Sequence, residues 1–223
     1  MIVGSVSFGI PEKEVKFLQV TMNLDVFVEG GTYQGGTAAV MSNIFSKVYT
    51  IENSEVMYEK AKEKLKQYSN VSMLKGDTRA HLHGILENND NILFWLDAHW
   101  SGGDTYGKSD ECPLIKELEI IFNYEKNCVI LIDDARLFLA PPPLPHDYKE
   151  WPSLSDITKV IPADWDLVEY EDVIYLYSKN IESKFKSFLQ QSITSAWREQ
   201  SKSNILNDVK SSLKKLLSVR NLA

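Results

Sequence analysis

The chain has 223 residues, of which 43% are hydrophobic and 25% are charged. This composition is typical of a folded globular protein with a sizeable core, and it excludes a disordered chain, a collagen-like repeat and a disulfide-rich scaffold. The formal net charge of −7 argues against binding of duplex nucleic acid by the chain as a whole.

Three features bear on the cellular compartment. The first residues lack the basic and apolar regions of a signal peptide. Apolar runs stay short of the roughly 18 residues that a membrane span needs. The two cysteines, Cys112 and Cys128, favour a reducing environment without a disulfide framework. We therefore expect a cytoplasmic protein.

Short β-rich runs alternate with helical patterns over most of the chain. The predicted strands are residues 25–29, 48–52, 71–74, 91–96 and 128–132. Most of these runs are continuously apolar, as in strands buried on both faces of a parallel sheet. The predicted helices between them are residues 37–45, 54–68, 78–88 and 113–123. This alternation predicts a doubly wound α/β sheet.

The end of the α/β region departs from that rhythm. Residues 166–170 and 173–178 are two strands separated by two residues, which favours an antiparallel hairpin. The predicted fold is therefore a Rossmann-like seven-stranded doubly wound sheet with an antiparallel C-terminal hairpin. Before the hairpin, residues 139–153 contain five prolines, which exclude a regular element, and loops of this length often bind ligands or act as lids.

Charge is unevenly distributed along the chain. Residues 181–223 contain eight Lys or Arg and three acids, whereas residues 1–180 contain 16 basic and 28 acidic residues. Apolar residues recur at helical spacing on both sides of a predicted break at residues 201–204. We therefore expect an α/β domain over residues 1–180, followed by a basic amphipathic helical extension over 181–223. The extension could pack on the acidic domain, mediate a homo-oligomer or lie on an anionic membrane surface.

A glycine-rich turn follows the first strong strand and opens a helix. It runs from Glu29 to Thr37 with the letters EGGTYQGGT. Its glycines allow a tight turn and close approach of the backbone to a ligand. The spacing is not the dinucleotide pattern GxGxxG, and an acid two residues before Gly31 suits a ligand with a cationic head. The alternative interpretation is a turn that serves helix packing only.

Acids also end the next two predicted strands. Glu52 is the last residue of the second strand, where a carboxylate can accept the hydroxyls of a ribose. Asp77 follows the third strand, where an adenine amino group could be bound. Either acid alone is a weak signal. Together with Glu29, the three strand-end acids predict a nucleoside ligand that lies across the strand ends.

This pattern resembles the class I S-adenosylmethionine-dependent methyltransferases over about residues 20–180. In that family the acid-glycine loop holds the methionine part, the acid of the next strand holds the ribose, and an acid after the third strand lies by the adenine. The resemblance implies that the cofactor-binding residues are Glu29, Gly31, Thr32, Gly35, Thr37, Glu52, Asn53, Asp77, Thr78 and Asp97.

A second group of acids follows the fourth and fifth strands. Asp97 comes directly after residues 91–96, and Asp133 and Asp134 come directly after residues 128–132. Three carboxylates on adjacent strand ends are suited to Mg²⁺ or a similar ion, and without a cation they would repel one another. The alternative is that Asp133 and Asp134 only cap a turn.

The layout is similar to that of the metal-dependent macrocin and novobiocin sugar O-methyltransferases. That resemblance implies a divalent ion held by Asp97, Asp133 and Asp134. The proposed general base of that group stands two residues beyond the first ligand, and this position is His99 here. An imidazole can act as a general base near neutral pH. We therefore expect Asp97 and His99 to be catalytic. His99 itself and an apparent insertion over 101–111 depart from the group's pattern.

The sequence thus predicts an S-adenosylmethionine-dependent O-methyltransferase, assisted by a divalent metal, that acts on a hydroxyl of a sugar or another small polar metabolite. Loops 101–111 and 139–153 would form the acceptor pocket, and His146 could touch substrate. The predicted aromatic walls are Trp100, Tyr106, Tyr148 and Trp151. The alternatives are an NAD-type oxidoreductase, disfavoured by the missing GxGxxG, and a non-catalytic binding or scaffold protein.

Overall fold

The computed structural model describes residues 9–97, 99 and 110–220, with the backbone alone over 203–220. The aromatic residues Trp100 and Tyr106 and most of loop 101–111 lie outside the described residues. The chain divides into two compact units. Described residues 9–182 belong to the first, which we call the body, and residues 183–220 belong to the second.

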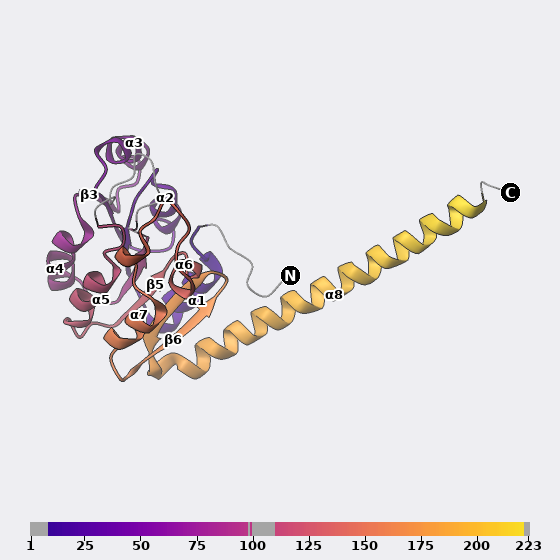
Figure 1. Cartoon of the computed structure of the whole chain (residues 1–223). Helices are drawn as coiled ribbons and strands as arrows, with labels where there is room; N and C mark the ends of the chain where they lie inside the picture. Colours follow the sequence, from indigo (N-terminus) through magenta and orange to yellow (C-terminus); the bar gives the residue numbers. More distant parts are fainter. Residues whose placement is uncertain (1–8, 98, 100–109, 221–223) are drawn as a thin grey trace. The chain divides into compact units, whose positions relative to one another are not determined.

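A seven-stranded sheet forms the centre of the body (Figure 1). The strand order is β3-β2-β1-β4-β5-β7-β6. The strands are β1 (Val26–Gly30), β2 (Lys47–Glu52), β3 (Val71–Lys75), β4 (Ile92–Leu96), β5 (Cys128–Ile132), β6 (Trp165–Tyr170) and β7 (Val173–Ser178). The first five pair in parallel, and β7 is antiparallel to both β5 and β6. The predicted sheet and its terminal hairpin are confirmed.

The carboxyl ends of the central strands lie level with one another. Gly30 at the end of β1 pairs with Ile51 of β2 on one side and Leu96 of β4 on the other. Leu96 in turn pairs with Ile132 of β5. The chain order reverses between β1 and β4, and such a switch point is where open α/β sheets usually bind ligands. The residues after β1, β2, β4 and β5 therefore meet in one region.

The body contains seven described α-helices. They are α1 (Glu12–Met22), α2 (Gly36–Met41), α3 (Glu55–Leu65), α4 (Thr78–Asn88), α5 (Leu114–Phe122), α6 (Arg136–Leu139) and α7 (Leu154–Val160). Three of them, α2, α3 and α4, connect successive parallel strands of the first four. Two single turns of 3₁₀-helix are η1 (Tyr148–Glu150) and η2 (Lys179–Ile181). The helix predicted over 37–45 ends early, because the side chains of Ser42 and Asn43 bond to the carbonyl of Ala39 and compete with helix continuation.

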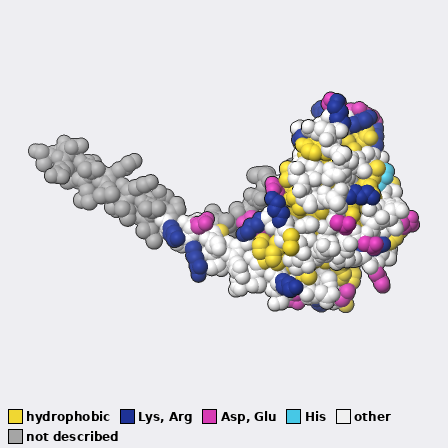
Figure 2. All heavy atoms as spheres, turned by 180° about the vertical axis from the view of Figure 1, so that it is seen from behind, with side chains coloured by type: hydrophobic (Ala, Val, Ile, Leu, Met, Phe, Trp, Pro, Cys, Tyr) yellow, Lys and Arg dark blue, Asp and Glu magenta, His cyan; other side chains and the backbone are white. Residues whose placement is uncertain are grey.

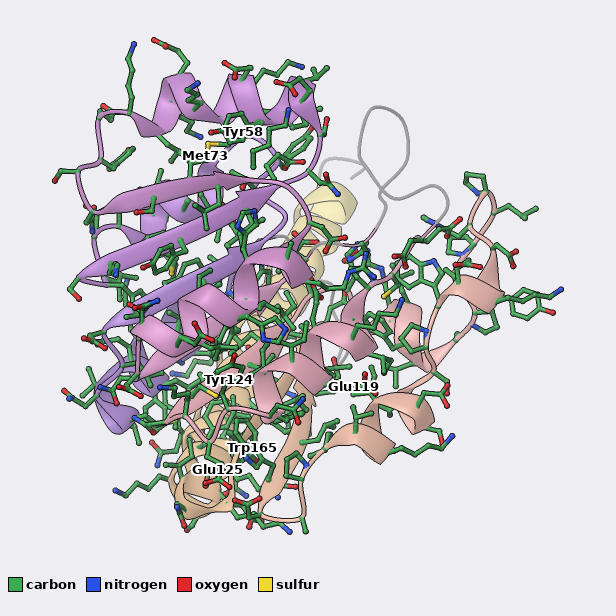
Figure 3. All side chains as sticks on the ribbon, turned by 90° about the vertical axis from the view of Figure 1, so that its left-hand side faces the viewer. Tyr58, Met73, Glu119, Tyr124, Glu125 and Trp165 are labelled. Atoms are coloured by element: carbon green, nitrogen blue, oxygen red, sulfur yellow. The ribbon has the colours of Figure 1, made fainter. Side chains whose placement is uncertain are left out.

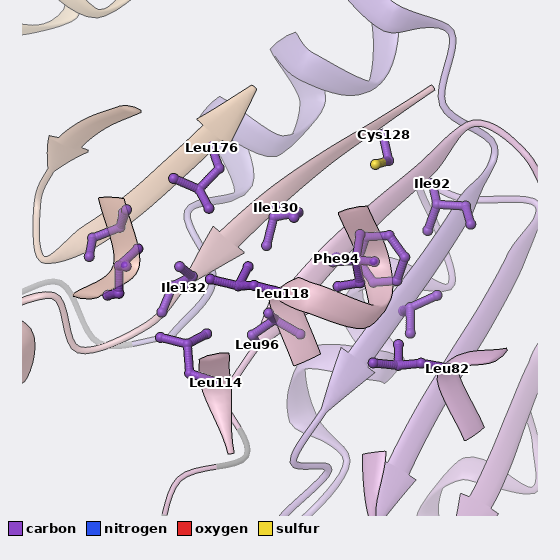
Figure 4. Packing of buried hydrophobic residues seen from close by; sticks show 14 of the residues in the cluster. Leu82, Ile92, Phe94, Leu96, Leu114, Leu118, Cys128, Ile130, Ile132 and Leu176 are labelled. Atoms are coloured by element: carbon purple, nitrogen blue, oxygen red, sulfur yellow. The ribbon is translucent and has the colours of Figure 1, made fainter. Parts of the chain in front are cut away.

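Successive side chains of each central strand point to alternate faces of the sheet, and both faces are covered. Ile92, Phe94 and Leu96 of β4 join one apolar cluster with Leu82 of α4 and Leu118 of α5 (Figure 4). The intervening β4 residues are also buried and point to the opposite face of the sheet. This two-sided burial explains why the strand sequences are continuously apolar and why they were predictable.

The described residues of the second unit all belong to one helix, α8 (Glu182–Arg220), which begins one residue earlier (Figure 1). The break predicted at residues 201–204 is wrong. This stretch contains neither glycine nor proline, and the hydroxyl of Ser201 donates to the carbonyl of Trp197 at 2.9 Å, so the side chain is satisfied inside the helix. None of the helices in the described part of the chain is long and apolar enough to cross a membrane.

Charged residues of the body divide into exposed and buried ones. Basic and acidic side chains are interspersed on the face of the body drawn in Figure 2. Exposed pairs such as Lys16–Glu12 contribute only about 0.2–1 kcal/mol each. The described acids that are buried are Glu14, Glu29, Glu52, Glu111, Glu117 and Asp172. Because a buried charge needs compensating partners, each of these acids must be protonated, hydrogen-bonded or paired with a basic group.

Candidate active site at the carboxyl edge of the sheet

The glycine-rich turn brings Glu29 beneath the loop that follows β1. Gly31 and Gly35 adopt φ angles of 91° and 70°, which glycine enters without a steric penalty. Glu29 is 1% exposed, and it accepts hydrogen bonds from the hydroxyls of Thr50 and Thr37. Burial raises the pKa of Glu29 to about 8, against the effect of these bonds. The carboxyl group is therefore poised to ionise when a cation binds.

Glu52 ties the end of β2 to the same turn. Its Oε2 accepts the backbone N–H of Tyr33 at 2.8 Å, and its Oε1 accepts the backbone N–H of Ser54 at 2.8 Å. The hydroxyl of Thr32 lies 2.6 Å from that of Thr50, which links the turn to β2. Since each carboxylate oxygen can accept more than one hydrogen bond, Glu52 retains acceptor capacity for ligand hydroxyls. Asn53 follows it and is half-buried.

Asp77 lies at the end of β3, but its carboxylate is already paired. It caps α4 by accepting the N–H of Arg79 at 2.9 Å, and the guanidinium of Arg79 contacts both of its oxygens. The same guanidinium reaches Asp110 at 2.7 Å. The hydrogen bond from Arg79 holds the pKa of Asp77 below its usual value. An adenine beside the end of β3 would meet an ion pair rather than a free carboxylate.

A buried glutamate that sequence reasoning missed lies close to that ion pair. Glu117 of α5 is 1% exposed, and the hydroxyl of Thr78, itself buried, donates to it. Its Oε1 has no hydrogen-bond partner among the described residues. Burial raises the pKa of Glu117 to about 7, the charge of Asp77 adds to the rise, and Arg79 opposes it. The apolar spacing of α5 gave no sign that this acid faces inward.

His99 lies between two strand-end aspartates. Its Nε2 is 3.0 Å from Asp134 Oδ2, and its Nδ1 is 3.6 Å from Asp97 Oδ1. Burial lowers the pKa of His99, but the hydrogen bond to Asp134 and the nearby carboxylates outweigh burial and raise it. Burial and the neighbouring carboxylates raise the pKa of Asp97, while His99 opposes the rise. The side chain of Asp97 is 34% exposed and that of His99 only 7%.

Asp133 and Asp134 follow β5, and both are half-buried. Asp133 Oδ1 accepts the backbone N–H of Asp134 at 2.8 Å. Asp134 adopts a left-handed φ of 56°, and its Oδ1 lies 2.8 Å from the guanidinium of Arg136. Burial raises the pKa of Asp133 to about 6, whereas the bonds from His99 and Arg136 overcome burial and lower the pKa of Asp134.

The predicted metal ligands do not come together as a metal site. Among the described residues, no group of three or more His, Cys, Asp or Glu side chains has the arrangement that could hold a metal ion. The physical reason is that two basic side chains already compensate Asp134, His99 at one carboxylate oxygen and Arg136 at the other. The three aspartates therefore do not fit a divalent ion as they are arranged.

The loop over residues 139–153 adjoins this cluster. Trp151 is 7% exposed, and its ring centroid lies 5.2 Å from that of His99 and 5.2 Å from that of His146. Buried Glu111 anchors the loop, because it accepts Trp151 Nε1–H at 2.7 Å and the N–H of Asp147 at 3.2 Å, and lies 3.1 Å from His146 Nδ1. Thus His146 serves the loop's attachment.

We expect Glu111→Ala to detach this loop. The substitution leaves the buried indole N–H of Trp151 without an acceptor, and an unsatisfied buried group costs about 1–3 kcal/mol. Urea denaturation should show that loss of stability, and limited proteolysis should cleave residues 139–153 faster. Glu125→Ala, which removes an exposed acid, serves as the control. Equal proteolysis of both variants would contradict the anchoring role.

Described residues of the body line hollows on its surface. A cavity of about 200 Å³ is lined by apolar residues of the 137–142 segment together with Tyr148, Trp151, Pro152 and Ser153, and it shares Trp151 with the site above. A larger one, of about 780 Å³, includes Tyr124, Glu125 and Trp165, which lie near one another in Figure 3. Because Cys128 and Trp165 begin their strands, the larger hollow lies at the opposite edge of the sheet from the strand-end acids.

Comparison with solved structures identifies the fold. A candidate O-methyltransferase from Klebsiella pneumoniae has a TM-score of 0.56 and 12% identity, over 78% of this chain and 84% of that chain. A candidate caffeoyl-CoA O-methyltransferase from Staphylococcus aureus gives 0.55 and 16%, over 78% and 86%. A methyltransferase from Podospora anserina with bound S-adenosylhomocysteine gives 0.53 and 15%, over 77% and 80%. The body has the class I methyltransferase fold.

The likeness lies in the fold, since no protein-family model and no curated protein sequence matches the chain. Within this methyltransferase fold, the structure groups the predicted residues in two sets. Glu29, Thr32 and Thr37 gather with Glu52 around the turn after β1. Asp97 and His99 gather with Asp134 after β4 and β5.

Proposed function

We propose that this protein is an S-adenosylmethionine-dependent methyltransferase that methylates a hydroxyl group of a small molecule. The observation that carries the proposal is that two sets of acids share one sheet edge, a buried set around the glycine turn and a half-buried set around His99. The likeness in fold to methyltransferases supports it. The cofactor is a cation, and the edge that would receive it is rich in carboxylates.

Cofactor binding would use the turn after β1 and the ends of β2 and β3. The buried carboxyl of Glu29 lies where the cationic methionine part would bind, beside Gly31 and Gly35. Glu52 has acceptor capacity left for the ribose hydroxyls, next to Asn53. The adenine would lie toward the Asp77–Arg79 pair and Thr78.

The reaction would be an in-line displacement. The acceptor oxygen forms a bond to the methyl carbon, the carbon–sulfur bond breaks with its electron pair going to sulfur, and the acceptor's proton must leave. We assign the proton to the Asp97–His99 pair, in which Asp97 is the accessible member and His99 holds it from behind. Because the sulfonium is already activated, positioning supplies most of the remaining catalysis. No step of this proposal runs through a metal ion.

The acceptor would lie against the loop over 139–153. The cavity of about 200 Å³ beside Trp151 is lined mainly by apolar and proline residues, and the exposed Tyr148 is also part of its lining. Such a lining favours a ring or another apolar part of the acceptor. The sugar acceptor implied by the macrocin-type resemblance and a phenolic acceptor are both to be included in a screen with a labelled methyl donor.

Calorimetric titration separates the proposal from its alternatives. The full chain is titrated with S-adenosylhomocysteine and with NAD, each in EDTA and in Mg²⁺. We expect S-adenosylhomocysteine to bind with equal affinity in both buffers and NAD not to bind. Binding of NAD alone would support an oxidoreductase. Binding of neither would leave a scaffold function and would overturn the proposal.

We further propose that the basic residues 181–223 contact either a second copy of the chain or an anionic membrane surface. The excess of Lys and Arg in this segment supports the proposal. Light scattering of the full chain should give a mass above that of one protomer in the first case. Sedimentation with vesicles containing phosphatidylserine should recover the protein in the second case. A monomer that leaves the vesicles unbound would contradict both.

A further inference from the structure

We infer that side chains of this chain, His99 and Arg136, neutralise the acid cluster after β4 and β5 and take the position that a divalent ion would need. The inference rests on the proposed function for the reaction that the cluster serves. It departs from the metal-assisted reaction that the sequence predicts. It stands on the contacts of Asp134, Arg136 and Asp172.

Asp134 is the centre of the arrangement. Its Oδ2 lies 3.0 Å from His99 Nε2, and its Oδ1 lies 2.8 Å from the Arg136 guanidinium. Mg²⁺ binds carboxylate oxygens at about 2.0–2.1 Å in nearly ideal octahedral geometry. An ion that approached Asp134 would therefore have to displace one of these two side chains. The imidazole also stands between Asp134 and Asp97, since its Nδ1 is 3.6 Å from Asp97 Oδ1.

Arg136 is held in place by the β6–β7 hairpin. Asp172, in the two-residue turn of that hairpin, is 6% exposed. Its carboxylate accepts the backbone N–H of Arg136 at 2.9 Å and also contacts the guanidinium. Its carbonyl accepts the N–H of Ala135 at 2.8 Å. The guanidinium thus contacts two carboxylates, those of Asp172 and Asp134.

The contacts form a chain of alternating charge. It runs from Asp172 through Arg136 to Asp134, and from there through His99 to Asp97. Repulsion between carboxylates on neighbouring strand ends is the reason that such clusters usually need a bound cation. Here a fixed arginine and a histidine supply that compensation from within the fold. Arg136 is therefore a positioning residue for Asp134 and His99.

The test is a titration with Mn²⁺ alone. Binding is measured as the loss of the free-ion signal in electron paramagnetic resonance at room temperature. The wild-type chain should leave the Mn²⁺ signal unchanged. Arg136→Gln frees one oxygen of Asp134 and a second carboxylate on Asp172. It should bind Mn²⁺ at least about tenfold more tightly than the wild type, a difference of about 1.4 kcal/mol. Adding Asp134→Asn to Arg136→Gln should abolish this binding.

Two variants control for loss of charge and loss of fold. Lys126→Gln removes a cation that pairs with Asp90 at 2.8 Å and should not create a Mn²⁺ site. Arg136→Lys keeps the charge and should behave as the wild type. Titration with S-adenosylhomocysteine, which tests the proposed function separately, shows whether each variant is folded.

Stoichiometric Mn²⁺ binding by the wild type, lost in Asp134→Asn, would overturn the inference while leaving S-adenosylhomocysteine binding intact. Failure of a folded Arg136→Gln variant to bind Mn²⁺ would also count against it, because the arginine would then not be what excludes the ion.

Discussion

His99→Gln is expected to lower methyl transfer to the acceptor about 100- to 10,000-fold, the usual contribution of a general acid–base group. The reason is geometric. Glutamine cannot stand between Asp134 and Asp97 as the imidazole does. The carboxylate of Asp97 therefore loses the side chain that positions it and balances its charge. Affinity for S-adenosylhomocysteine should change by less than about threefold, because the lost interaction belongs to proton removal.

The measurement is single-turnover transfer from labelled methyl donor to an acceptor found by screening. Asp97→Asn should cause a loss of similar size. The double variant should be no slower than the slower single variant, since residues that act as a unit are not additive. His83→Gln, at an exposed histidine that lies 3.1 Å from the hydroxyl of Tyr124, is the matched control. Full activity of His99→Gln would remove the Asp97–His99 pair from the mechanism.

Binding of S-adenosylhomocysteine at pH 7 is expected to release a proton from Glu29. Burial raises the pKa of this carboxyl to about 8, so it is mostly protonated in the free protein at pH 7. A ligand ammonium nearby favours the ionised form. Affinity should therefore rise with pH, approaching about tenfold per unit below pH 8, and level off above it. Calorimetry in buffers of different ionisation enthalpy measures the released proton.

Glu29→Gln should abolish that proton release and weaken binding about 10- to 100-fold, because a neutral amide cannot pair with the ligand cation. Glu87→Gln, at an exposed acid of α4, should leave both unchanged. The raised pKa of Glu29 also makes the stability of the fold depend on pH. A carboxyl whose pKa rises from 4.5 to about 8 on folding favours the folded state at low pH, and this contribution is lost as the pH rises through that window. Proton release that persists in Glu29→Gln would assign it to another group.

Local patterns in the sequence predicted the sheet because the central strands are buried on both faces. Continuous apolar runs such as residues 128–132 are typical of strands buried in a parallel sheet, and β5 has those bounds. The acids at strand ends were predictable for a related reason. The carboxyl ends of parallel strands meet at one edge, so Glu29, Glu52 and Asp97 had to lie near one another once the sheet was known.

Partners of those acids were not predictable in the same way. Asp77 occupies the expected strand end, yet Arg79, two residues on, turns back and pairs with it. The aspartates after β4 and β5 suggested a metal site, but the cation between them comes from His99 and from Arg136. A sequence pattern indicates which acidic side chains lie at the edge of the sheet. It does not indicate which basic side chains pair with them.

By itself, the sequence determined the sheet, its terminal hairpin and the edge at which the strand-end acids lie, because each depends on burial patterns of a few residues. Only the tertiary structure decided how those acids are compensated. Asp172 reaches Arg136 across 36 residues of sequence, and Glu111 reaches Trp151 across 40. Contacts at such separations depend on the packing of the hairpin and the loop against the sheet. The acids of the body therefore divide into carboxylates that pair with basic side chains, such as Asp134 and Asp172, and carboxylates that accept only uncharged donors, such as Glu29.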